Sequence, residues 1–218
     1  MSVLPIFSAF VTFICLVSAI MWNLVGLEVF AVLAFGAVVW LILDTNFTFG
    51  IRYEWAFWLF ILSEALIFAT LFFCTYWNFE DVDFSRLSDH MEVPFAGCFF
   101  LLSSSFTATL FHHFMDMNDF QANLNLLYSV ILGMGFLVLQ VVEFNEAVSS
   151  ITWSCYHSCC YGVVGLHFFH VLAGLLVIIT MIVRGYQTFG YHLCTVVVWY
   201  WHFVDYIWLL VYILIYVI

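Results

Sequence analysis

Seven long apolar stretches alternate with short polar breaks along the 218 residues of this chain. A helix needs about 20 apolar residues to cross a bilayer, whereas a membrane β-strand is shorter and alternates polar with apolar positions. The pattern therefore predicts an all-α, polytopic membrane protein whose seven transmembrane helices form one bundle in a single membrane domain of residues 1–218. The predicted helices cover residues 3–22, 27–43, 53–79, 94–114, 122–145, 156–183 and 194–217.

Composition supports the membrane assignment. The chain is 67% hydrophobic and only 8% charged, and its mean hydropathy is +1.14. These values lie far outside the range of soluble globular domains. Only three residues are basic against 14 acidic ones, which excludes a nucleic-acid partner because such binding needs a cationic surface.

The three arginines predict the orientation of the chain. Arg52 and Arg184 fall in breaks on the same side as the N-terminus, and Arg86 falls on the other side. Because cytoplasmic loops carry the excess of basic residues, the N-terminus is predicted to be inside. The first stretch has no basic leader and no small-residue cleavage site, so we expect a retained helix and not a signal peptide.

Two ionisable residues interrupt the last apolar stretch. His202 and Asp205 are three residues apart, which places them on one helical face near the middle of a segment long enough to span a bilayer. Ionisable groups at that depth are costly and mark either a functional site or polar packing between helices. Both interpretations stay open at this stage.

Glu64 is the most isolated acid in the chain. It lies about a dozen residues from either end of the third stretch, with Ser63 as its only polar neighbour. Desolvation there favours the neutral acid. Such a group can relay protons, bind a lipid headgroup or form a hydrogen bond across helices.

Glu143 and Glu146 form a second acidic pair, at the end of the fifth stretch. Carboxylates three residues apart on a helix can hold a cation or act as acid and base. At a helix end, however, such residues are more often solvated.

Histidines raise the alternative of haem binding. His167 and His170 lie on one face of the sixth stretch, His112 and His113 end the fourth, and His202 lies in the seventh. Two imidazoles on facing helices can hold one iron, which would make the chain a membrane cytochrome. Against this, His167 and His170 share a face and point at the same neighbour.

A cysteine cluster precedes these histidines. Cys155, Cys159 and Cys160 surround His157 where the sixth stretch begins. The spacing meets a zinc or copper site only in part, so free thiols or a disulfide are favoured.

Together these segments resemble subunit III of the haem-copper cytochrome c oxidases. The resemblance runs from the third helix to the C-terminus, and its strongest part is WYWHFVDYIWLLVYILIY at 199–216. The supporting residues are Ser63, Glu64, His112, His113, Gln140, Glu143, Glu146, Ala147, Gly165, His167, His170, Val171 and Gly174.

The resemblance implies a seven-helix bundle split by a lipid-filled cleft, with the N-terminus on the matrix or cytoplasmic side. It implies an accessory core subunit of complex IV in the mitochondrial inner membrane, or less readily in a bacterial plasma membrane. Such a subunit braces subunit I beside subunit II, sustains proton uptake and holds ordered phospholipid. Haem and copper then belong to the partner subunits, and this chain has no catalytic residue, metal or cofactor of its own.

The resemblance also assigns roles to single residues. Glu64 is implied to be a buried carboxylate facing the lipid cleft, and Arg184 is placed to meet a lipid phosphate. The residues implied to provide polar packing and lipid or subunit contacts are His167, His170, His202 and Asp205, and two further implied contacts are Glu143 and Glu146.

Some features depart from the family pattern. The first two helices show no convincing match, the loop after the third helix is short, and Phe168 and Phe169 stand where a small residue is usual. Two alternatives therefore stay open, a stand-alone haem cytochrome that uses His167, His170, His112 and His202, and the equivalent subunit of a quinol oxidase.

Overall fold

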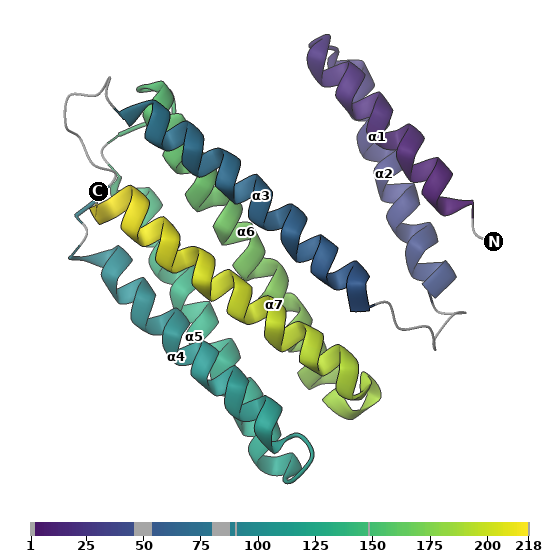
Figure 1. Cartoon of the computed structure of the whole chain (residues 1–218), viewed down its shortest axis with the longest axis vertical. Helices are drawn as coiled ribbons and strands as arrows, with labels where there is room; N and C mark the ends of the chain where they lie inside the picture. The colour runs from purple at the N-terminus through teal and green to yellow at the C-terminus, as the bar shows by residue number, and fades with distance from the viewer. Residues whose placement is uncertain (1–2, 46–53, 80–87, 90, 148, 218) are drawn as a thin grey trace. The chain divides into compact units, whose positions relative to one another are not determined.

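A computed structural model describes residues 3–45, 54–79, 88–89, 91–147 and 149–217 (Figure 1). Within these ranges the secondary structure is helical throughout, without a strand. The α-helices are α1 Leu4–Ile20, α2 Leu24–Thr45, α3 Glu54–Trp77, α4 Val93–Phe114, α5 Asp119–Glu146, α6 Cys155–Arg184 and α7 Gly190–Val211. Two short elements flank α7, a 3₁₀ turn η2 at Tyr186–Thr188 and a π-helical stretch η3 at Tyr212–Val217.

The all-α class is confirmed, and each predicted helix is present within a few residues of its expected bounds. Six helices are apolar and long enough to cross a membrane. The first helix, α1, has 17 residues and is about 25 Å long at 1.5 Å per residue, slightly shorter than a hydrocarbon core of about 30 Å. A crossing by α1 therefore stays a prediction.

The chain divides into two compact units, Met1–Glu54 and Trp55–Ile218. The first contains α1 and α2, which lie side by side as a helical hairpin (Figure 1). Asn23 closes the turn between them by accepting a hydrogen bond from the Gly26 amide at 3.3 Å. Phe7 and Trp40 pack across the hairpin with ring centroids 5.7 Å apart.

The second unit is built around α4, α5, α6 and α7, which pack on one another (Figure 1). Trp201 of α7 is 1% exposed and donates a hydrogen bond to the Ser104 hydroxyl of α4 at 3.0 Å. Its indole also lies against Gly133 of α5 and Gly174 of α6. One side chain thus connects all four helices.

Helix α3 packs on the four-helix core through side-chain contacts with α6 and α7. Phe68, its most deeply buried residue, packs on His170 of α6 with ring centroids 5.2 Å apart. Trp58 packs on Trp199 of α7 at 5.3 Å. Most other large side chains of α3 are exposed, as expected for a helix that faces lipid.

Local sequence signals set the ends of α5, α6 and α7. The Asn118 side chain caps α5, and the Ser154 side chain caps α6. Gly185 ends α6 with φ of 80°, a left-handed conformation that favours glycine. The chain then enters η2, where burial raises the pKa of Tyr186 to about 12 and its hydroxyl donates to Asp119 of α5.

Gly174 gives a test of the contact with Trp201. A Cβ at this position would lie 2.9 Å from the indole ring, so Gly174→Ala should lower the free energy of unfolding by about 1 to 3 kcal/mol through overpacking. Gly165→Ala on the same helix is the matched control, because a Cβ there meets nothing within 4 Å. Thermal unfolding of the purified protein in detergent measures both variants, and equal stability of the two would contradict the prediction.

Candidate functional site

Glu64 of α3 contacts His170 of α6, with Glu64 Oε2 2.9 Å from His170 Nε2. The two side chains are 18% and 12% exposed, so they lie at the edge of the bundle and not in its centre. The other ring nitrogen, Nδ1 of His170, lies 2.7 Å from the Leu166 carbonyl oxygen one turn earlier. Among the alternatives for Glu64, the structure thus shows the hydrogen bond across helices.

The hydrogen bonds of His170 fix how many protons the pair holds. A carbonyl oxygen only accepts, so Nδ1 carries a hydrogen. The contact between Nε2 and Glu64 then needs one more proton, which belongs either to a neutral carboxylic acid or to an imidazolium ring. The net charge of the pair is zero in both forms, which is the state that a low-dielectric surrounding favours.

His202 of α7 connects to α4 through both ring nitrogens. Nδ1 lies 2.5 Å from the Ser105 hydroxyl, and Nε2 lies 3.2 Å from the Thr109 hydroxyl. Two turns closer to the start of α7, Thr195 contacts Nε2 of His112 at 3.1 Å. On the polar face of α7, His202 and Thr195 thus form a line of hydrogen bonds to α4.

His167 and Asp205 lie deeper in the bundle, at 0% and 1% exposed. Nε2 of His167 lies 3.1 Å from the Val204 carbonyl and so donates to it. Within the described ranges, Nδ1 of His167 and Oδ1 of Asp205 are among the buried polar atoms that have no hydrogen-bond partner. This burial corrects the expectation of direct lipid or subunit contact for His167 and Asp205, because the chain's own helices enclose both.

The acidic pair of α5 divides between two environments. Glu143 is 3% exposed and accepts hydrogen bonds from Gln140 at 2.7 Å and from Ser88 at 3.1 Å. The buried side chain of Tyr216 from η3 lies beside it. The expectation of solvation, like that of lipid contact, is therefore wrong for Glu143, whereas Glu146 is exposed.

Arg184 is exposed at the end of α6, where a lipid phosphate can reach it. The other two arginines, Arg52 and Arg86, lie outside the described residues, so the predicted orientation stays a prediction. Phe168 packs on Phe144, and Phe169 is exposed.

The partners of the histidine ring nitrogens and the state of the cysteine thiols bear on the haem and metal alternatives. Both ring nitrogens of His170 and His202 are engaged by the protein, as is Nε2 of His112 and of His167. All seven cysteines are free thiols, which answers the choice between thiols and a disulfide. Across the described part of the chain, no three His, Cys, Asp or Glu residues are grouped to hold a metal ion.

Sequence reasoning missed the hydroxyl partners on α4. Ser104, Ser105 and Thr109 bind Trp201 and His202, although serine and threonine in a membrane helix usually bond to their own backbone. The signal that could have found two of them is the four-residue spacing of Ser105 and Thr109, which places both hydroxyls on one face of α4.

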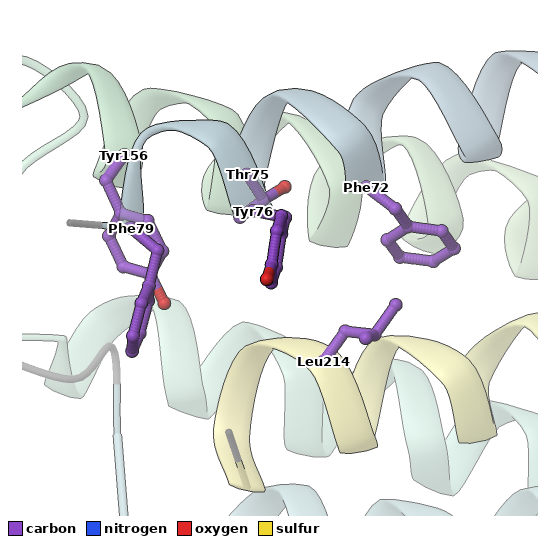
Figure 2. A pocket seen from close by; sticks show the side chains of 6 residues that line it. All are labelled: Phe72, Thr75, Tyr76, Phe79, Tyr156 and Leu214. Atoms are coloured by element: carbon purple, nitrogen blue, oxygen red, sulfur yellow. The ribbon is translucent and has the colours of Figure 1, made fainter.

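An aromatic recess lies between α3, the start of α6 and η3 (Figure 2). Its lining residues are Phe72, Thr75, Tyr76, Phe79, Tyr156 and Leu214. The Thr75 hydroxyl bonds to the Leu71 carbonyl of its own helix at 2.7 Å, so the recess is largely apolar.

Comparison with known proteins places the chain among membrane oxidase subunits. Residues 1–218 match a family model described as cytochrome c oxidase subunit III. This match includes α1 and α2, which corrects the expectation that the resemblance begins only at the third helix.

Similar proteins come from animals and from a bacterium. Cytochrome c oxidase subunit 3 of Drosophila yakuba is 34% identical over 191 residues, covering 78% of this chain and 70% of the fly protein. The protein of the same name from Artemia franciscana is 34% identical over 194 residues, covering 79% and 71%. That of Bacillus sp. (strain PS3) is 35% identical over 173 residues, covering 73% and 83%.

The contact between Glu64 and His170 can be measured by a double-mutant cycle. Glu64→Leu leaves His170 Nε2 without a partner and should lower the free energy of unfolding by about 1 to 3 kcal/mol, whereas Glu64→Gln can still donate to that nitrogen and should cost less. In the variant that also carries His170→Leu, the two losses should not add. Additive losses would show that the two side chains do not interact.

Proposed function

This chain belongs to the cytochrome c oxidase subunit III family, and on that premise we propose how it acts within respiratory complex IV. It is a core accessory subunit of this oxidoreductase complex and carries no catalytic residue. Haem and copper are held by subunits I and II, to which this chain binds. The observation that carries the proposal is the family match over the full chain, and the engagement of the histidine ring nitrogens by protein groups supports it.

The contribution to catalysis is indirect. The chain braces subunit I and so sustains proton uptake to the oxygen-reducing site. The hydrogen bonds between α4 and α7 and the junction around Trp201 support this role, because they join the helices of the second unit into a packed core against which a partner can rest.

Phospholipid binds along the partly exposed polar residues. Glu64 and His170 lie at the bundle edge as a pair of zero net charge, whose carboxyl group can accept a hydrogen bond from a headgroup. Arg184 at the end of α6 provides a charge-assisted contact to phosphate. The remaining candidates for lipid or subunit contact are His202, which is partly exposed, and Glu146, which is exposed. The aromatic recess suits an acyl segment (Figure 2).

The chain crosses the mitochondrial inner membrane seven times as a single domain, with its N-terminus on the matrix side. The six long apolar helices support a multi-pass protein, and α1 completes the seventh crossing by local thinning of the bilayer. Relatives occur in animals and in a Bacillus strain, so labelling of the two termini from either side of isolated mitochondria tests both the location and the orientation.

Isolation of the complex tests the proposed function. Affinity purification of the tagged chain in mild detergent should recover partners that carry two haems and copper, and the preparation should oxidise cytochrome c. Oxidation of quinol instead would assign the chain to a quinol oxidase. A Soret band in the chain stripped of its partners, abolished by His167→Ala with His170→Ala, would overturn the proposal in favour of a stand-alone cytochrome.

Glu64→Gln tests the role of this partly exposed carboxylate. We expect assembly to stay intact, because the amide can still pair with His170, while phospholipid retention falls or activity decays faster during turnover, because the exchangeable proton is lost. Glu92→Gln is the control, since this carboxylate is exposed and is not among the proposed lipid contacts. Lipid phosphorus per complex and the half-life of oxygen consumption are the measurements, and unchanged values for Glu64→Gln would count against the role.

A further inference from the structure

Two cysteines at the start of α6 form a pair that the oxidase function does not use. Cys155 is the first residue of the helix, and Cys159 follows one turn later. Residues four apart on a helix have Cβ atoms about 5 to 6 Å apart on one face. Cys155 is exposed and Cys159 is partly exposed, so a solute can reach them.

The other cysteines differ from this pair in access or in spacing. Cys98, Cys160 and Cys194 are buried, and the sulfur atoms of Cys98 and Cys194 bond to backbone carbonyls. Cys74 is exposed near the end of α3. It belongs to a different helix, so it serves as a control for a site within α6.

The number of protein ligands at this pair indicates which kind of metal ion it can hold. Structural zinc takes four ligands and catalytic zinc takes three protein ligands. In the described ranges no third His, Cys, Asp or Glu joins this pair to make such a group. Soft monovalent ions such as Cu(I) favour thiolate ligands, and two thiolates can hold such an ion in linear coordination.

We propose that Cys155 and Cys159 form a two-thiolate site for a soft monovalent metal ion of the Cu(I) class. Binding converts two thiols and one monovalent ion into a bis-thiolate complex of charge −1 and releases two protons, without a change of oxidation state. The proposal does not depend on the role of the chain in the oxidase.

Thiol alkylation of the intact complex tests the site. The detergent-solubilised complex is treated anaerobically with one equivalent of Cu(I), or of Ag(I) as a redox-inert probe, and alkylated at each cysteine with a maleimide. We expect the labelling rates of Cys155 and Cys159 to fall together by about tenfold or more, because a metal-bound thiolate is a poor nucleophile. Labelling of Cys74 should not change.

Two serine variants separate this site from the alternatives. Cys155→Ser should remove the protection of Cys159, whereas Cys74→Ser should leave the protection of both intact. The proposal fails if Cys159 stays protected in Cys155→Ser, if Cys74→Ser abolishes protection, or if the two cysteines are already joined by a disulfide in the native complex. Cytochrome c oxidation by each variant is measured to show that the complex is assembled. The rate of this oxidation does not test the metal site.

Discussion

Polar side chains at membrane depth must find their partners inside the protein, because lipid offers them none, and this constraint determines how the helices of the second unit are joined. Glu64 meets His170 between α3 and α6, and His202 meets Ser105 and Thr109 between α7 and α4. An apolar surface gains little from helix association in lipid, so interhelical hydrogen bonds and close packing supply the specificity. The polar residues of this chain are thus first of all the connections between its helices.

Close packing adds the second part of that specificity. Trp201 packs against glycines on α5 and α6 and forms a hydrogen bond with a serine on α4. The two glycines leave the space that the large indole ring occupies. Helix α3 docks on α6 through Glu64 and Phe68 and on α7 through Trp58. Loss of the Glu64 contact would therefore affect the docking of α3 more than the four-helix core.

The helices could be predicted from the sequence because twenty-residue apolar runs have one structural solution in lipid. The partners of the polar residues could not, since 106 positions separate Glu64 from His170 and no local pattern encodes that contact. Glu143 was misjudged for a related reason. Its place near a helix end suggests solvent, but Gln140, Ser88 and Tyr216 close over it, and two of these three come from other segments of the chain.

The pairing of Glu64 with His170 also explains how an acid can lie at the partly exposed edge of the helix bundle without a fixed charge. The single proton between Oε2 and Nε2 can belong to either residue, and the net charge is the same in both cases. A lipid headgroup or a neighbouring subunit that approaches the pair changes the position of the proton and not the charge within the membrane. The carboxylate can therefore respond to its surroundings at little electrostatic cost, whereas an unpaired glutamate at this depth would have to bind or release a proton from water.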